Sequence, residues 1–223
     1  MIKAILFDLD NTLVDFMAMK KKSCEAAIDA MIASGLEIKR DEALKILFEL
    51  YDKYGIEYQQ IFQKFLEKTK GKVDYKILAN GVIAYRKIRE FYLSPYPRVI
   101  PTLIELKKKY TLAIITDAPR LQAWLRLVSM KIDSFFDIVI TAADVRKKKI
   151  TAAPFKAALK ELKIKPEEAM MVGDWIDRDI KTAKSLGIKT CYARYGDEKP
   201  APLGQSGADY EIEDIKDLIK IIF

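Results

Sequence analysis

The chain alternates short apolar runs with longer stretches of helical periodicity, and this alternation restricts the possible folds more than any other feature. The first run, residues 2–7, contains β-branched residues and ends directly at an acid, and four more runs follow at 112–115, 138–140, 169–172 and 188–192. Helical patterns occupy the intervals at 99–109, 119–130, 152–163 and 178–186. Short apolar runs separated by helices are typical of buried parallel strands in βαβ units. The sequence therefore predicts an α/β fold with a doubly wound parallel sheet.

Residues 16–94 have a different character, because they contain little glycine or proline and keep helical periodicity throughout. Four helical segments can be distinguished: one ending at Gly35, one from about Arg40 to Tyr51, and two more at about 57–68 and 74–92. Such a block, inserted after one strand of a sheet, is expected to pack as a helical bundle of its own. We therefore predict a core formed by residues 1–15 and 96–223 and an inserted helical domain formed by residues 16–95.

Histidine is absent from the 223 residues. Its absence excludes mechanisms that depend on an imidazole, including Ser-His-Asp and Cys-His nucleophiles and HExxH metalloproteases. Acid–base chemistry must then use carboxylates, lysines, tyrosines or metal-bound water. The two cysteines, Cys24 and Cys191, lie far apart and belong to no CxxC motif. We expect both to be free and inert, and we expect no structural zinc site.

The excess of 39 basic over 32 acidic residues gives a formal charge of +7, which would attract anions such as phosphorylated metabolites or nucleic acid. Lys and Glu are interspersed, however, and no nucleic-acid-binding motif is present, so we expect an ordinary solvated surface and no nucleic-acid partner. No apolar stretch reaches the roughly 18 residues that cross a bilayer, and the first run does not continue into a secretory signal. We predict a cytoplasmic protein with no membrane partner.

Acidic and hydroxyl side chains follow the predicted strands. They are Asp8 and Asp10 after the first strand, Thr116 and Asp117 after the second, Asp144 after the third, and Asp174 and Asp179 after the fourth. Taken singly, any of these could cap a helix or close a turn. The carboxyl ends of parallel strands meet at one edge of a sheet, however, where ligands bind. Clustered carboxylates need a cation or raised pKa values, and oxygen ligands suit Mg²⁺ better than zinc. We therefore predict a Mg²⁺ site at this edge.

Together these residues resemble the motifs of the haloacid dehalogenase-like hydrolases. Asp8-Leu9-Asp10-Asn11-Thr12 is similar to the DxDxT signature of that family, and Thr116 to the hydroxyl residue of its second motif. Gly173-Asp174-Trp175-Ile176-Asp177-Arg178-Asp179 is similar to its GDxxxxD motif. The helical block falls where the family inserts its type I cap. The resemblance therefore covers essentially the whole chain and implies a Rossmann-like core with a helical cap domain.

The lysine of the third family motif has three candidates here: Lys147, Lys148 and Lys149. In the family this lysine stands in a KPxPxxF context, and aligning Phe155 with the final Phe selects Lys149. Ile150 and Ala152 then replace both prolines of that motif. We favour Lys149 as the functional residue because a phosphate among carboxylates needs a nearby cation, and we keep Lys148 as the alternative.

The resemblance implies a magnesium-dependent phosphatase that passes through an aspartyl-phosphate. Asp8 is then the nucleophile, and Asp10 is the general acid and base. The implied Mg²⁺ ligands are Asp8, the backbone carbonyl of Asp10, and Asp174, with Asp179 in support. The implied phosphate ligands are Thr116, Lys149 and backbone N–H groups around Leu9 and Asp117. Mg²⁺ is the only cofactor implied.

Substrate and assembly are less constrained. The segment from Ile56 to Pro97 resembles archaeal sugar-phosphatase-type members, among them glyceraldehyde 3-phosphate phosphatases, which implies a small phosphorylated metabolite as substrate. A phosphosugar mutase, a phospho-accepting signalling domain and a degenerate, non-catalytic member remain as alternatives. Asp10 disfavours a dehalogenase. The sequence is compatible with a monomer or a homodimer.

Overall fold

A six-stranded parallel sheet is the centre of the fold in the computed structural model, which describes residues 1–222. The strands are β1 (Ala4–Phe7), β2 (Thr111–Thr116), β3 (Ile138–Thr141), β4 (Ala169–Gly173), β5 (Lys189–Ala193) and β6 (Tyr210–Ile212). They lie in the order β3-β2-β1-β4-β5-β6, and every neighbouring pair is parallel. The chain moves outward from β1 through β2 to β3 and then crosses back to β4. The α/β fold predicted from the sequence is confirmed.

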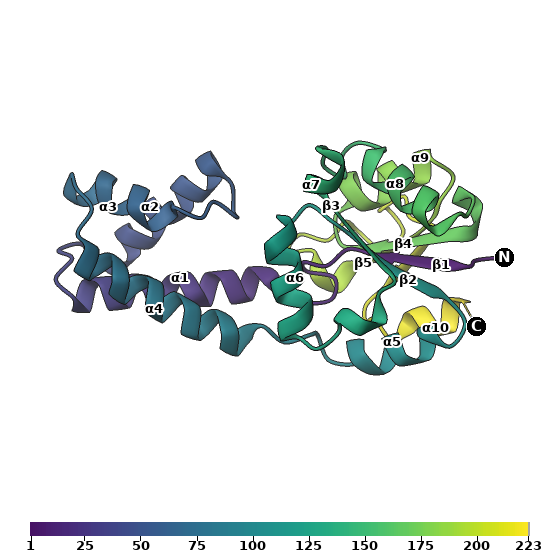
Figure 1. The fold of residues 1–223 in the computed structure, drawn as a ribbon, viewed down its shortest axis with the longest axis horizontal. Helices are drawn as coiled ribbons and strands as arrows, with labels where there is room; N and C mark the ends of the chain where they lie inside the picture. The colour runs from purple at the N-terminus through teal and green to yellow at the C-terminus, as the bar shows by residue number, and fades with distance from the viewer. Residues whose placement is uncertain (223) are drawn as a thin grey trace. The chain divides into compact units, whose positions relative to one another are not determined.

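Helices cover both faces of this sheet (Figure 1). The helices α5 (Val99–Lys107) and α10 (Asp217–Ile222) lie on one face, and α8 (Ala153–Leu162) and α9 (Lys181–Ser185) lie on the other. All four residues of β1 are buried, as its uninterrupted apolar sequence predicts. Side chains from β1, β2 and β4, among them Leu6, Ile115 and Met171, pack against Phe155 and Leu159 of α8. Because β1, β2 and β4 are parallel, their carboxyl ends lie at one edge of the sheet.

The chain divides into two compact units. One consists of Met1–Phe16 and the chain from Ser94 onward, and the other is Met17–Leu93. The second unit is helical, and its elements are α1 (Phe16–Ala33), α2 (Arg40–Tyr54), α3 (Ile61–Lys70) and α4 (Tyr75–Tyr92). The helix α1 begins one residue before the unit itself, which starts at Met17. Apolar residues from all four helices form its own core, including Ile28, Leu47, Phe65 and Ile77. It therefore has the independent packing expected of an inserted bundle.

Some local predictions differ from the structure. The third helix of the bundle begins at Ile61 rather than near residue 57, and it ends at Gly71, whose φ of 74° terminates it in a left-handed conformation. The expected helix at 178–186 is a π-helical turn, Ile176–Ile180, that continues into α9. The sequence patterns did not predict α7 (Ala142–Val145), β6 or α10, all of which are six residues or shorter. Such short elements owe their conformation to tertiary contacts rather than to periodicity.

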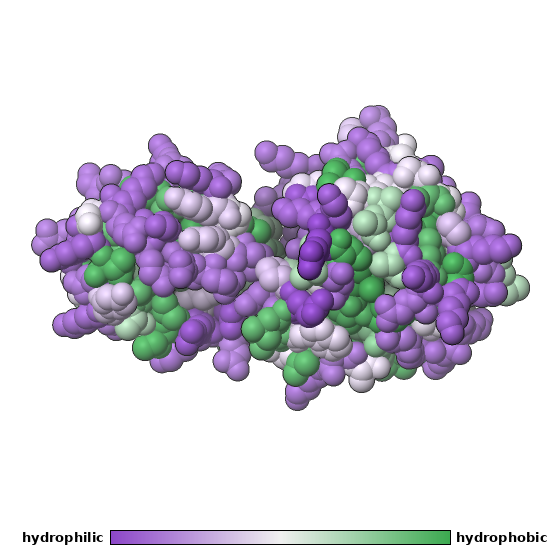
Figure 2. All heavy atoms as spheres, turned by 45° about the horizontal axis from the view of Figure 1, so that its top comes forward, coloured by the Kyte–Doolittle hydropathy of each residue, from purple (hydrophilic) through white to green (hydrophobic). Residues whose placement is uncertain are grey.

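Hydrophilic residues make up most of the molecular face shown in Figure 2. No helix within residues 1–222 is long and apolar enough to cross a membrane. Cys24 and Cys191 are both buried and free, as predicted.

Candidate functional site

Three carboxylates meet at the carboxyl end of the sheet, between β1 and β4, where the strand order changes direction. Asp8 directly follows β1, and its backbone N–H donates to the Val172 carbonyl at 2.9 Å, which extends the pairing of β1 with β4 by one residue. Asp174 directly follows β4, and Asp179 lies on the π-helical turn that comes next. Ligands of doubly wound sheets bind at such a change of direction. The sheet topology therefore places these acids where a ligand is expected.

The side chains of Asp8, Asp174 and Asp179 are buried, and each offers an oxygen within 4.8 Å of the others. Burial raises the pKa of the Asp8 carboxyl, and burial together with the nearby Asp8 raises the pKa of Asp174 well above its usual range. Burial also raises the pKa of Asp179 to about 6, although the ammonium of Lys149 opposes this shift. Such shifts are the expected cost of gathering like charges in a medium of low dielectric constant.

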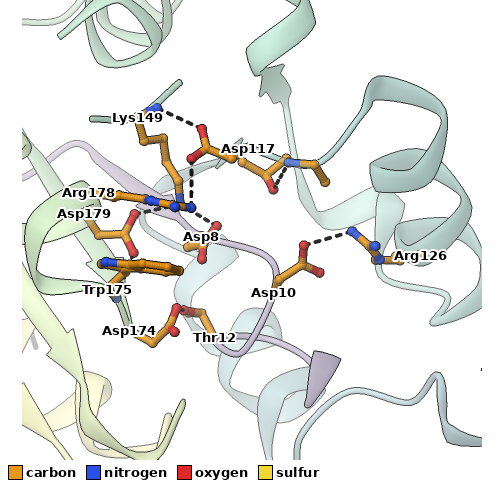
Figure 3. Close-up of polar contacts among 12 residues, drawn as sticks. Asp8, Asp10, Thr12, Asp117, Arg126, Lys149, Asp174, Trp175, Arg178 and Asp179 are labelled. Atoms are coloured by element: carbon orange, nitrogen blue, oxygen red, sulfur yellow. Dashed lines mark hydrogen bonds and ion pairs between the residues drawn. The ribbon is translucent and has the colours of Figure 1, made fainter. Parts of the chain in front are cut away.

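Lys149 is the cation within this group. Its Nζ lies 2.6 Å from Oδ1 of Asp8 and 2.6 Å from Oδ1 of Asp179, and the residue is only 3% exposed (Figure 3). Burial alone would lower the pKa of the Lys149 ammonium, but the carboxylates of Asp179 and Asp8 outweigh burial and raise this pKa above its usual value. Lys147 and Lys148 are exposed. Of the three candidate lysines, the structure therefore brings Lys149 to the carboxylates.

The charge of this cluster fits a divalent cation. Three ionised carboxylates and one ammonium sum to two negative charges, and the donors are hard oxygens of the kind that Mg²⁺ prefers. The hydroxyl of Thr12 donates to Oδ1 of Asp174 at 3.2 Å and orients that carboxylate. The residues present therefore fit Mg²⁺ by both charge and ligand chemistry.

Asp117 connects three loops of the site. Its Oδ1 accepts a hydrogen bond from the backbone N–H of Lys149 at 2.8 Å, and its Oδ2 accepts one from Nη1 of Arg178 at 3.3 Å. The guanidinium of Arg178 also stacks 3.6 Å from the ring centre of Trp175. The loop after β2, the loop that carries Lys149 and the loop after β4 are thereby tied together. The sequence predicts a phosphate contact for the backbone of Asp117 but gives no sign of these side-chain contacts.

Thr116 lies at the same edge as the carboxylates. In the parallel pairing of β1 with β2, Phe7 is opposite Ile114, so Thr116 is level with the residues just after β1. Its side chain is buried, and its Oγ1 accepts from the backbone N–H of Ala118 at 3.1 Å. A hydroxyl that accepts in this way still carries a proton that it can donate. Thr116 can therefore donate a hydrogen bond to an anion at this edge.

Two close approaches of the backbone require glycine. A Cβ on Gly173 would overlap the carboxylate of Asp179, which is also held by the backbone N–H of Trp175 at 3.1 Å. A Cβ on Gly196 would overlap the carbonyl of Asn11, which lies in the turn after β1 with a left-handed φ of 60°. Asn tolerates this conformation better than most residues. Gly173 belongs to the motif that ends at Asp179, whereas no sequence motif marks the close approach at Gly196.

Asp10 lies apart from the three clustered carboxylates. Its Oδ2 accepts from Nη1 of Arg126 at 2.8 Å, and in Figure 3 its carboxylate points toward that arginine. Arg126 belongs to α6 (Arg120–Ser129) and was not predicted as a site residue. The sequence does contain an indication of its role: Arg126 is a charged residue on the same helical face as the buried Ala123 and Leu127, where an apolar residue would be expected.

Asp144 follows β3 at the same edge of the sheet, but its side chain does not join the cluster of Asp8, Asp174 and Asp179. Its carboxylate accepts from the backbone N–H of Thr141 at 2.7 Å, where it caps the short helix α7, and it also pairs with Arg120. The cap satisfies backbone donors at the start of a helix. Asp144 therefore has a structural partner on its own element, and the structure does not bring it to the other carboxylates.

Comparisons with known proteins agree with this geometry. The sequence profile of the family described as haloacid dehalogenase-like hydrolase matches residues 5–193. A glyceraldehyde 3-phosphate phosphatase of Methanocaldococcus jannaschii is 37% identical over 223 residues, covering 100% of this chain and 97% of that protein. A protein of the same name from Pyrococcus furiosus is 36% identical, covering 99% and 93%. The crystal structure of a HAD phosphatase from Thermococcus onnurineus superimposes with a TM-score of 0.73 at 29% identity, covering 99% of this chain and 97% of that one.

Proposed function

Since the chain belongs to the haloacid dehalogenase-like hydrolases and is a phosphatase, we propose that it hydrolyses the phosphate monoester of a small metabolite through a phosphoaspartate on Asp8. The observation that carries this proposal is the placement of Lys149, whose ammonium lies between Asp8 and Asp179 at 2.6 Å from each. A nucleophilic carboxylate must be ionised and must approach an anionic phosphoryl group. A buried cation beside it supports both requirements.

The proposed reaction has two steps. In the first, an oxygen of Asp8 attacks phosphorus and forms an acyl-phosphate bond, the P–O bond to the leaving group breaks, and the leaving alcohol takes a proton from Asp10. In the second, Asp10 accepts a proton from a water molecule as that water attacks phosphorus, and the carboxylate of Asp8 is released with inorganic phosphate. Asp10 thereby returns to its protonated state. The two acids lie on one turn, two residues apart, so a single loop supplies the nucleophile and the proton carrier.

The phosphoryl oxygens need donors while charge redistributes in the transition state. Lys149 and Thr116 are the side chains that we propose for this role, with backbone N–H groups around Leu9 and Asp117. Asp117 acts through its side chain as well, because it holds the backbone of Lys149. Asp8, the backbone carbonyl of Asp10, and Asp174 would hold Mg²⁺, with Asp179 close by. When bound, the ion would neutralise negative charge on the phosphoryl group.

For the substrate we propose a small phosphorylated metabolite of the glyceraldehyde 3-phosphate type. The names and full-length similarity of the archaeal relatives support this choice. We further propose that residues 16–95 serve as the cap domain and that residues 1–15 and 96–223 form the catalytic core.

A substrate screen tests the proposed function. Phosphate release should be measured from p-nitrophenyl phosphate and from three-carbon and sugar phosphates, with Mg²⁺ and with a chelator. We expect metal-dependent release from several small esters and the highest kcat/KM on a three-carbon phosphate. A requirement for a bisphosphorylated sugar, with isomerised sugar phosphate as the product, would instead identify a mutase. No release from any ester would favour a non-catalytic member.

A further inference from the structure

Arg126 carries a buried charge, and neither of the two proposed reaction steps uses it. The residue is 5% exposed and lies in α6, a helix that contributes no other residue to the site. Burying a guanidinium is costly unless the charge is paired and hydrogen-bonded. Its partner is Asp10, at 2.8 Å between Nη1 and Oδ2. The guanidinium also lies over the ring of Phe16, 4.5 Å from its centre, which restricts its movement.

The structure gives each catalytic carboxylate of the first loop a different cation. Asp8 is paired with Lys149, which lies between α7 and α8, and Asp10 is paired with Arg126, which lies in α6. The two acids are only two residues apart, so a single nearby cation could attract both. Loss of Arg126 would remove this ion pair from Asp10, and Lys149, the cation that phosphate needs, would then compete for the Asp10 carboxylate. The separate pairing keeps the two acids in separate positions.

We propose that Arg126 is a positioning residue: it holds the carboxylate of Asp10 in the position from which it acts as general acid and base, and it keeps that carboxylate away from Lys149. This inference rests on the proposed function, because it assigns Arg126 to the acid–base group of that mechanism. Arg126 need not touch the phosphoryl group; it acts through Asp10. Arg126 is suited to fix a carboxylate in one orientation, because its planar guanidinium is charged, carries several N–H donors and contacts the ring of Phe16.

A misplaced general acid has a signature that depends on the leaving group. An alkoxide leaves slowly unless it is protonated, whereas p-nitrophenolate leaves without help. Loss of Arg126 should therefore lower kcat/KM for an alkyl phosphate far more than kcat/KM for p-nitrophenyl phosphate. Misplacement of a reacting group by about 1 Å lowers the reaction rate roughly 10²-fold. We use kcat/KM because it reports on the steps up to release of the alcohol, before Asp10 acts as a base.

The test compares glycerol 3-phosphate with p-nitrophenyl phosphate for wild type, Arg126→Met, Arg126→Lys and Asp10→Asn. For Arg126→Met we expect kcat/KM to fall about 10²-fold on glycerol 3-phosphate and less than about threefold on p-nitrophenyl phosphate. Arg126→Lys should show the same pattern with a smaller loss of kcat/KM, since lysine keeps the positive charge but lacks the planar guanidinium. In the Asp10→Asn background, Arg126→Met should change neither value further, because its effect passes through Asp10.

The matched control is Arg120→Met, which removes an exposed arginine of the same helix whose partner is Asp144. It should leave both kcat/KM values at the wild-type level. Equal losses on the two substrates for both Arg126 variants, or no loss for either, would overturn the inference. If Arg126→Met does not fold, the ratio of the two kcat/KM values for Arg126→Lys decides the question. Absence of turnover in the wild type would instead overturn the proposed function, so the two failures are distinguishable.

Discussion

The carboxylate of Asp117 accepts a hydrogen bond from the backbone N–H of Lys149 at 2.8 Å, and so it fixes the loop that carries the cation of the site. Ile150, the residue after this lysine, is exposed, which leaves little packing at that position to hold the loop. Asp117→Ala should therefore lower kcat/KM for p-nitrophenyl phosphate about tenfold, which corresponds to one hydrogen bond of roughly 1.4 kcal/mol. Asp117→Asn keeps an oxygen acceptor and should stay within about threefold of wild type. Equal losses in the two variants would show that Asp117 matters through its charge.

Removing the ammonium of Lys149 should weaken both phosphate binding and turnover. We expect Lys149→Met to lower kcat by roughly 10²–10³-fold, the range found when one group that stabilises transition-state charge is lost. The inhibition constant for inorganic phosphate should rise as well, because the product also needs this cation. Lys148→Met is the matched control, since Lys148 is exposed and lies one residue away. A larger loss for the Lys148 variant than for the Lys149 variant would contradict the assignment.

Mg²⁺ should stabilise the protein increasingly as the pH rises. The folded-state pKa values of Asp8, Asp174 and Asp179 are raised above the value near 3.8, that of Asp179 to about 6. A raised acid pKa means that folding favours the protonated form, so this contribution to stability is present below about pH 4 and is lost as the pH rises through 6. Metal then relieves the repulsion between ionised carboxylates. Thermal unfolding with Mg²⁺ and with EDTA should show a Tm difference that grows from pH 5 to pH 8. A difference that shrinks over that range would contradict a Mg²⁺ site here.

Asp174→Asn should separate stability from metal binding. The substitution removes one of three buried like charges, so the metal-free variant should be more stable than metal-free wild type at pH 8. At pH 5 this gain should be smaller, because protonation then relieves the same repulsion in wild type. The variant should also gain little stability from added Mg²⁺. Chemical denaturation at the two pH values checks this prediction, and a variant that keeps the full Mg²⁺ stabilisation would show that Asp174 is not a ligand.

Gly173→Ala should disturb Asp179 with little change elsewhere. The added Cβ would overlap the Asp179 carboxylate, and one of these groups would have to move, at a cost of about 1–3 kcal/mol in the free energy of unfolding. The Mg²⁺ concentration for half-maximal activity should rise as well. Gly71→Ala provides a comparison, because a Cβ there would meet no atom within 4 Å although its positive φ also disfavours alanine. If Mg²⁺ requirements are unchanged in Gly173→Ala, Asp179 does not support the metal site.

The acids of the site were the easiest residues to predict from the sequence. Asp8 and Asp174 directly follow buried strands, and the position of a strand end is fixed once the sheet forms. Lys149 lies on a loop, so the sequence left Lys148 as an alternative until the structure showed which ammonium is buried. The helical periodicity marks Arg126 as a charged residue on the buried face of α6, but its contact with Asp10 depends on how α6 packs against the first loop, which periodicity does not give. Asp144 shows the opposite case, an acid after a strand whose side chain caps the next helix.

The central claim is that Asp8 becomes covalently phosphorylated, and acid-quenched enzyme tests it most directly. Asp10→Asn should be mixed with p-nitrophenyl phosphate and Mg²⁺, because this leaving group departs unaided whereas hydrolysis of the intermediate still needs the base. Peptide mapping should then find the phosphoryl group on the peptide that contains Asp8. The same peptide from the Asp8→Asn variant should carry no phosphoryl group. A phosphoryl group on another residue, or active enzyme that never carries one, would contradict the account.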